Sequence, residues 1–125
     1  MNLLLDTHVL LWWLADDDAL TDVERVAIAH PDNVVFVSSV SAWEIAIKAS
    51  MGKLDAPENL SEELSLNQFQ ELPVRIPHGL VAGHLPMHHR DPFDRMLIAQ
   101  AMSEDLTLVT HDQKFRAYEV RLLSL

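Results

Sequence analysis

The sequence predicts an α/β protein built on a parallel sheet that is covered by helices. Short apolar, β-rich runs alternate with helical patterns along the chain, and this alternation is typical of parallel sheets. The 125 residues fit one domain of ordinary size, and a hydrophobic fraction of 49% supplies a core for it. We therefore expect a single domain over residues 1–125.

The first half of the chain contains two predicted strands and three predicted helices. The run Val34 to Val37 is continuous and β-branched, as a buried parallel strand should be. Thr21 has the residue type of a helix cap, and Pro31 marks the end of the helix that follows it. In chain order we predict a strand over Leu3 to Leu5, a helix that ends near Asp16, a helix from Thr21 to about Ala29, a strand over Val34 to Val37, and a helix over Ser41 to Ser50 that Gly52 stops.

The second half contains the strongest helical pattern of the chain. Pro92 stands at the first position of this helix, where proline is favoured because its missing N–H would be unpaired anyway. In chain order we predict a helix over Asn59 to Gln70, a short edge strand over Pro73 to Pro77, a short helix over about Gly79 to His84, the helix Pro92 to Met102, and strands over Leu106 to Val109 and Val120 to Leu123.

The composition narrows the possible classes of function. The absence of cysteine excludes disulfides and thiolate metal sites. No apolar run approaches the ~20 residues that span a bilayer, and the start of the chain lacks the basic region of a signal peptide, so we expect a cytoplasmic protein with no membrane partner. The formal net charge of −10 gives no overall attraction to phosphate. A nucleic-acid substrate would therefore need local cations or bound metal, and a basic protein partner fits the charge as well.

Four acids stand where predicted strands end or where predicted helices begin: Asp6, Glu44, Asp94 and Asp112. An open α/β sheet gathers the carboxyl ends of its strands in one crevice. Carboxylates crowded there repel one another unless a hard cation lies between them, and Mg²⁺ and Mn²⁺ prefer oxygen ligands. Two such ions about 3.5–4 Å apart would clamp both oxygens of an in-line displacement at phosphorus. The pattern favours a metal-dependent enzyme that cleaves phosphodiesters.

Each acid also has an ordinary structural explanation, because acids are preferred at helix starts. The segment Ser41 to Glu44 matches a capping box. Asp91 is placed to cap the long helix, with Asp94 in the first turn. Asp6 and Asp112 are likewise placed to cap the helices that follow them. Capping does not require an acid at every strand exit, whereas a cation site does, so we expect the four acids to act together.

The polar residues beside these acids are predicted to support them or to touch a substrate. Neighbouring hydroxyls can orient carboxylates or hold a metal-bound water, although simple strand-end capping explains them equally well. Lys48 stands four residues after Glu44, which is an ion-pair spacing on a helix. The pair His88-His89 matches no zinc-site spacing, and we interpret it as part of a loop. The supporting candidates are Thr7, Ser39, Thr110, His111, Arg95, Lys48 and Asp91, the last with a capping role first.

Four segments resemble the PIN-domain ribonucleases and, more narrowly, the VapC-type toxins of bacterial toxin–antitoxin pairs. The resemblance runs nearly end to end, in order and at family-like spacing. It implies a three-layer α/β/α sandwich with a central, mostly parallel sheet. The segments are Leu3-Leu4-Leu5-Asp6-Thr7-His8, Ser41-Ala42-Trp43-Glu44-Ile45-Ala46-Ile47-Lys48, Asp91-Pro92-Phe93-Asp94-Arg95-Met96-Leu97-Ile98-Ala99-Gln100-Ala101 and Leu108-Val109-Thr110-His111-Asp112.

The same resemblance implies an activity, a cofactor and partners. The activity is endonucleolytic cleavage of RNA by water, with Mg²⁺ or Mn²⁺ as cofactor. On the family pattern, Asp6, Glu44, Asp94 and Asp112 fall on the catalytic and metal-binding acids, and Asp6 and Asp94 fall on the usual ligands. The implied partners are a second copy of the chain and a cognate antitoxin whose basic C-terminal segment enters the acidic groove. The net charge of −10 fits that antitoxin.

Two other classes of protein compete with this interpretation. A phosphorelay receiver would need paired acids after its first strand and a lysine after a late strand. Here Asp6 stands alone and Thr110-His111-Asp112 contains no lysine. A non-catalytic, acidic protein-binding module would hold a basic peptide in the same crevice without cleaving RNA. Loss of RNA cleavage but not of partner binding in Asp94→Asn would separate the enzyme from this module.

Overall fold

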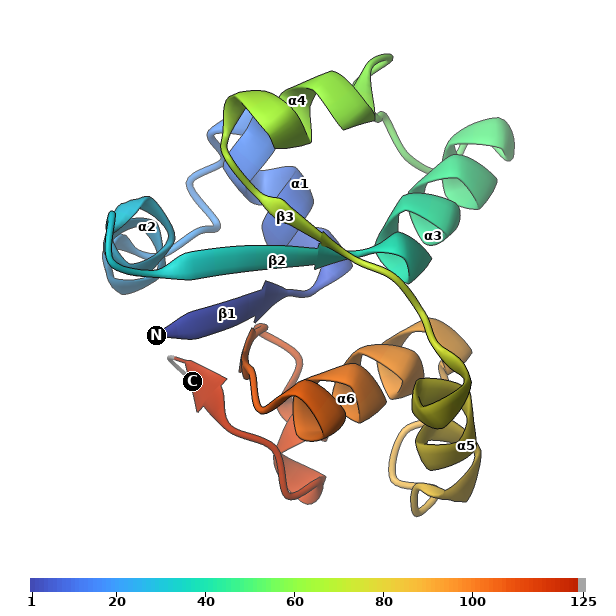
Figure 1. The fold of residues 1–125 in the computed structure, drawn as a ribbon. Helices are drawn as coiled ribbons and strands as arrows, with labels where there is room; N and C mark the ends of the chain where they lie inside the picture. Colours follow the sequence, from blue (N-terminus) through green and yellow to red (C-terminus); the bar gives the residue numbers. More distant parts are fainter. Residues whose placement is uncertain (124–125) are drawn as a thin grey trace.

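A five-stranded, all-parallel sheet forms the centre of the computed structural model, which describes residues 1–123 (Figure 1). The strand order across the sheet is β3-β2-β1-β4-β5. The strands are β1 (Asn2–Leu5), β2 (Val34–Ser38), β3 (Gln70–Leu72), β4 (Thr107–Val109) and β5 (Leu122–Leu123). The predicted α/β class and its parallel sheet are confirmed.

Helices cover both faces of the sheet, so the fold is the three-layer sandwich expected from the resemblance. Figure 1 shows α1 and α4 on one side of the sheet, with α6 and α5 on the other. The helices are α1 (Thr7–Ala15), α2 (Asp22–Ala29), α3 (Ser39–Ser50), α4 (Leu60–Leu66), α5 (Ile76–His84) and α6 (Pro92–Glu104), together with the short 3₁₀ helix η1 (Gln113–Ala117). None of these helices is long and apolar enough to cross a membrane.

Strand β1 separates two hydrophobic cores. Leu3 and Leu5 belong to the core beneath α1 and α2, whereas Leu4 belongs to the core that α6 and η1 cover. All three side chains are fully buried. This alternation follows from the two-residue period of a strand, whose successive side chains point to opposite faces. A continuous apolar run is therefore what a strand with two covered faces requires.

The chain changes direction across the sheet between β1 and β4. From β1 it proceeds through β2 to β3 on one side, and then returns to place β4 and β5 on the other. In open α/β sheets, this is the point at which the carboxyl ends of neighbouring strands leave a crevice. The backbone N–H of Asp6, just after β1, donates to the carbonyl of Val109 at the end of β4, at 3.0 Å. Asp6 and the segment after Val109 are thereby fixed side by side.

Three local predictions were wrong. The helix predicted over Asn59 to Gln70 spans only Leu60–Leu66, because Gln68 takes a left-handed φ of 60° and Gln70 already belongs to β3. Helix α3 begins at Ser39, and its cap is Ser38, whose hydroxyl accepts from the N–H of Val40 at 3.1 Å. The predicted capping box at Ser41 does not form, because Ser41 already lies inside the helix. The expected edge strand over Pro73 to Pro77 is also absent. The strand forms earlier, at β3, and Pro77 instead lies in the first turn of α5, a position that suits proline.

Candidate active site

Asp6 is the most firmly held acid of the crevice. It caps α1, and its Oδ1 accepts from the N–H of Val9 at 2.8 Å. Its Oδ2 accepts from the hydroxyl of Thr110, which follows β4. Burial raises the pKa of Asp6, and these hydrogen bonds offset that rise only in part. The carboxylate is therefore fixed at the end of β1 by donors from two elements.

Glu44 reaches the same crevice from the second turn of α3. It is buried, and its Oε1 accepts from the hydroxyl of Thr7 at 2.7 Å. Its Oε2 lies 2.5 Å from Nζ of Lys48, in the ion pair predicted from their spacing. The hydrogen bond to Glu44 raises the pKa of Lys48, and the more distant Asp91 and Asp94 act in the same direction. The hydroxyl of Thr7 also lies 3.0 Å from that of Ser41.

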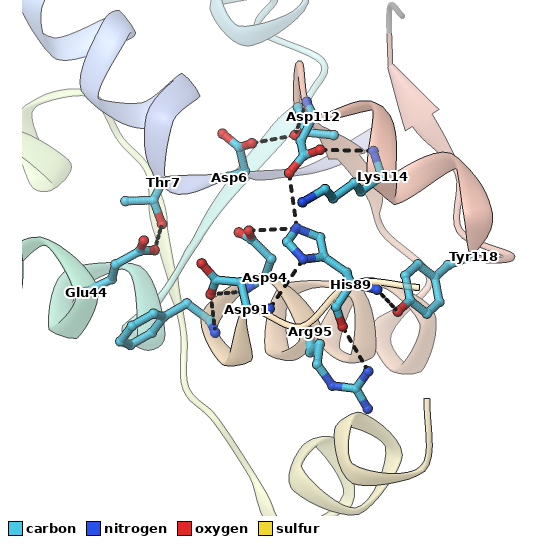
Figure 2. A network of polar contacts seen from close by, with 12 residues as sticks. Asp6, Thr7, Glu44, His89, Asp91, Asp94, Arg95, Asp112, Lys114 and Tyr118 are labelled. Atoms are coloured by element: carbon cyan, nitrogen blue, oxygen red, sulfur yellow. Dashed lines mark hydrogen bonds and ion pairs between the residues drawn. The ribbon is translucent and has the colours of Figure 1, made fainter. Parts of the chain in front are cut away.

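Asp91 and Asp94 enter the crevice at the start of α6. Asp91 is the cap, as predicted: its Oδ1 accepts from the N–H of Phe93 at 2.8 Å and of Asp94 at 3.3 Å. Asp94 points toward the other acids (Figure 2). Burial, followed by the charges of Asp91, Asp6, Glu44 and Asp112, raises the pKa of Asp94 to about 8. Ionisation of Asp94 is therefore opposed both by its burial and by the negative charges of its neighbours.

Asp112 closes the crevice from the β4 side. It caps η1 through Oδ1, which accepts from the N–H of Lys114 at 2.9 Å. Its own N–H donates to the hydroxyl of Thr110 at 3.1 Å. Because the same hydroxyl donates to Asp6, Thr110 links the two acids that follow β1 and β4. The prediction that Thr110 supports the acids agrees with these contacts.

His89 lies between two of the acids, and the sequence analysis missed it. Its Nε2 is 3.0 Å from Oδ2 of Asp94 and 3.0 Å from Oδ2 of Asp112 (Figure 2). The ring is buried and meets Phe115 edge-on. His89 does lie in a loop, as interpreted from the sequence, but the loop turns its side chain inward. The sequence feature that could have placed His89 in the site is its position two residues before Asp91, the cap of α6.

Two predicted supporting residues, Ser39 and His111, make contacts outside the acidic cluster. The hydroxyl of Ser39 accepts from the N–H of Val74 at 3.2 Å, which ties α3 to the segment after β3. Nε2 of His111 lies 2.7 Å from both carboxylate oxygens of Glu24. Burial opposes ionisation of Glu24, but hydrogen bonds from His111 and Thr21 outweigh it and lower the pKa of Glu24.

Arg95 also binds elsewhere than expected. Its guanidinium turns away from Asp94 and donates to backbone carbonyls at 2.7–3.2 Å. The carbonyls belong to the end of α5 and to the loop that carries His89: Ala82, Leu85, Pro86 and His89. Arg95 therefore holds the approach to α6 in place.

The donor set of the crevice suits a hard divalent cation. The side chains that converge are carboxylates, the ligands that Mg²⁺ and Mn²⁺ prefer. The ligand atoms of His89, Asp94 and Asp112 lie within 4.8 Å of one another. Burial, followed by the charges of the neighbouring acids, raises the pKa of Asp94 and opposes its ionisation. A bound cation would supply a compensating positive charge.

Fold and crevice together define an α/β protein with an acidic site at the switch point of its sheet. The sequence model of the PIN domain family matches residues 3–120 of the chain. The chain therefore belongs to the PIN domain family.

Individual relatives agree with this assignment. Ribonuclease VapC22 of Mycobacterium tuberculosis is 28% identical over 120 residues, which cover 94% of this chain and 92% of that protein. A chain in the structure of VapBC2 from Rickettsia felis, bound to a DNA fragment from its promoter, has the same fold, with a TM-score of 0.72, 18% identity and 98% of each chain covered. A chain in the structure of VapBC-1 from nontypeable Haemophilus influenzae matches with a TM-score of 0.70 and 19% identity, and covers 98% of this chain and 97% of its own.

Proposed function

We propose that this protein is a metal-dependent endoribonuclease and the toxin of a toxin–antitoxin pair. The observation that carries the proposal is the convergence of Asp6, Glu44, Asp94 and Asp112 at one crevice, with the pKa of Asp94 raised to about 8 by burial and by the other acids. The name of the relative Ribonuclease VapC22, and the VapBC structures that share the fold, support the same choice.

Asp6 and Asp94 are the residues we assign first as ligands of Mg²⁺ or Mn²⁺, and Glu44 and Asp112 complete the acidic set. When bound, the cation lowers the pKa of a coordinated water and neutralises charge that develops on the phosphate. The chain's own residues supply orientation. Thr110 fixes Asp6, and Thr7 with Lys48 fixes Glu44, so these carboxylates need no rearrangement to act.

The proposed partners follow from the charge of the crevice and from the family. RNA is the substrate. The cognate antitoxin would place a basic C-terminal segment in the acidic crevice, where its cations replace the missing positive charge. A net charge of −10 favours association with such a segment. We further propose a cytoplasmic homodimer, as the family resemblance implies.

Cleavage of total cellular RNA by the purified, antitoxin-free protein tests the proposal. The reactions contain Mg²⁺, Mn²⁺ or chelator, and the new RNA ends are mapped. Asp94→Asn is compared with Asp18→Asn, which makes the same chemical change in the exposed turn after α1. Discrete cuts that require metal, vanish in Asp94→Asn and persist in Asp18→Asn are expected.

The rival protein-binding module predicts a different outcome. A folded, metal-loaded protein that makes no cuts, yet binds a basic peptide equally well as wild type and as Asp94→Asn, would overturn the enzyme and favour the module. Cuts that persist in chelator would overturn the metal-dependent mechanism.

A further inference from the structure

Contacts of its backbone and of its ring hold His89 in the crevice. Its N–H donates to the hydroxyl of Tyr118 at 2.9 Å, and that hydroxyl donates to the carbonyl of Pro86 at 2.6 Å. Arg95 binds the carbonyls of both His89 and Pro86. The ring itself is buried against Phe115. The orientation of the imidazole is therefore set by the fold before any ligand arrives.

The backbone beside His89 selects the tautomer of the ring. The N–H of Asp91 donates to Nδ1 at 3.3 Å, so Nδ1 must offer its lone pair. In a neutral imidazole only one nitrogen carries the proton, and here that nitrogen is Nε2. Nε2 faces Oδ2 of Asp94 and Oδ2 of Asp112, each at 3.0 Å. The hydrogen bond of Nε2–H goes to Asp112, and Oδ2 of Asp94 lies beside it at the same distance.

The opposite tautomer is what a metal ligand would need. A metal can bind Nε2 only through its lone pair, which moves the proton to Nδ1 and sets it against the N–H of Asp91. Two donors would then face each other in a buried position, at the cost of two lost hydrogen bonds. His89, Asp94 and Asp112 lie as close together as three metal ligands would. The tautomer of His89 instead explains this proximity by hydrogen bonding.

We propose that His89 is a positioning residue that donates from Nε2–H to Asp112, lies against Oδ2 of Asp94, and does not ligate the metal. The inference rests on the proposed function, because it concerns the same acids. His89 lies against Oδ2 of Asp94, and within residues 1–123 no hydrogen bond reaches Oδ1, so that oxygen would be free to hold a cation. A ring that orients a ligating carboxylate in this way affects metal affinity strongly, although it does not touch the metal.

Long-range ¹H–¹⁵N NMR of the imidazole rings tests the tautomer directly in the wild-type protein, without and with Mg²⁺. The signals of His89 are assigned from the spectrum of His89→Gln. We expect Nε2 to carry the proton and Nδ1 to be unprotonated in both conditions. Loss of the Nε2 proton on addition of Mg²⁺ would overturn the inference, because it would make His89 a ligand.

Binding of Mg²⁺, measured by calorimetry, tests the positioning role. His89→Ala removes the donor and should weaken Mg²⁺ binding by about 10- to 100-fold. His89→Gln places an amide N–H near the position of Nε2 and should stay within a few-fold of wild type. His88→Ala is the matched control, since the exposed neighbouring ring meets Tyr118 rather than an acid, and should bind like wild type.

The outcomes separate this inference from the proposed function. Equal affinities for wild type and a folded His89→Ala would overturn the positioning role and leave the metal site standing, as would a His89→Gln as weak as His89→Ala. A folded wild type that binds neither Mg²⁺ nor Mn²⁺ would overturn the proposed function, and the role of His89 toward the metal with it.

Discussion

The acidic crevice has an inner half and an outer half, and the protein treats them differently. The inner half consists of Asp6, just after β1, and Glu44, in the second turn of α3; both are buried and receive two donors each from the chain. The outer half consists of Asp91, Asp94 and Asp112, which belong to α6 and to the segment after β4. There the pKa of Asp94 is raised to about 8.

The difference lies in the kind of donor that each half receives. Lys48 brings a full positive charge to Glu44 in the inner half. In the outer half, the ring of His89 lies 3.0 Å from Oδ2 of both Asp94 and Asp112. We therefore propose that a cation supplies the positive charge that the outer half lacks.

Asp94→Asn should have opposite effects on activity and on stability. Removing the charged ligand should lower RNA cleavage on the order of a thousandfold. Removing the most strongly repelled carboxylate should raise the unfolding temperature of the metal-free protein, because strained functional sites cost stability. Cleavage assays and thermal unfolding of the same preparation check both effects. A less stable Asp94→Asn would argue against electrostatic strain in the outer half.

The stability of the metal-free protein should fall as the pH rises. Burial and the neighbouring acids raise the pKa of Asp94 to about 8, from the 3.8 of an ordinary aspartate. Between these values the folded state keeps a proton that the unfolded chain has released, so stability is greatest at the acidic end of the window and declines toward pH 8. The decline should be on the order of a few kcal/mol.

Urea unfolding between pH 5 and pH 8.5 would measure this slope. Asp94→Asn removes the titrating group and should flatten the curve. Saturating Mg²⁺ should flatten it too, because the cation binds the ionised form. A wild-type stability that increases with pH over this window would contradict the assignment of the raised pKa to Asp94.

Thr110→Val should destabilise the inner half. The substitution keeps the shape of the side chain but removes the donor to Asp6 and the acceptor of the Asp112 N–H. A buried acceptor that loses a hydrogen-bond donor costs about 1–3 kcal/mol. Ser39→Ala removes a hydroxyl that binds only an exposed backbone N–H, and should cost less. Equal losses of unfolding free energy in urea would show that Asp6 does not depend on Thr110.

Lys48→Gln should have the smallest effect on stability. The ammonium is partly exposed, and solvent screens its interaction with Glu44. The hydroxyl of Thr7 still donates to Glu44 in the variant. We expect a loss of about 1 kcal/mol or less, measured by urea unfolding with Thr7→Val as the comparison. A larger loss for Lys48→Gln than for Thr7→Val would mean that the charge outweighs the buried hydrogen bond.

The sequence predicted the strand exits because their causes are local. Buried apolar runs end at polar residues: Asp6 follows one directly, and Asp112 follows another after Thr110 and His111. The exact start of α3 was not predictable in the same way, since Ser38, Ser39 and Ser41 are all acceptable caps and the pairing of β2 decides among them. The position of β3 was misjudged for a related reason: Pro77 is compatible both with an edge strand and with the start of a helix.

The parts of the site that escaped prediction depend on contacts between distant residues. His89 meets Asp112 from 23 positions away, and the ring becomes part of the site only because α6 returns beside η1. His111 and Glu24 are 87 positions apart, and nothing in the local sequence of either indicates the pair. Arg95 follows Asp94 directly, yet the helix turns it to the opposite side, toward the carbonyls at the end of α5.

Thermal unfolding with and without Mg²⁺ tests the central claim most directly, namely that a divalent cation completes the outer half of the crevice. It is measured near pH 7.5 for wild type and Asp94→Asn. With Mg²⁺ about a hundredfold above its dissociation constant, wild type should gain on the order of 10 °C. Asp94→Asn should have a higher unfolding temperature than wild type without Mg²⁺, and Mg²⁺ should raise it little. Equal gains for the two proteins, or no gain for wild type, would contradict the account.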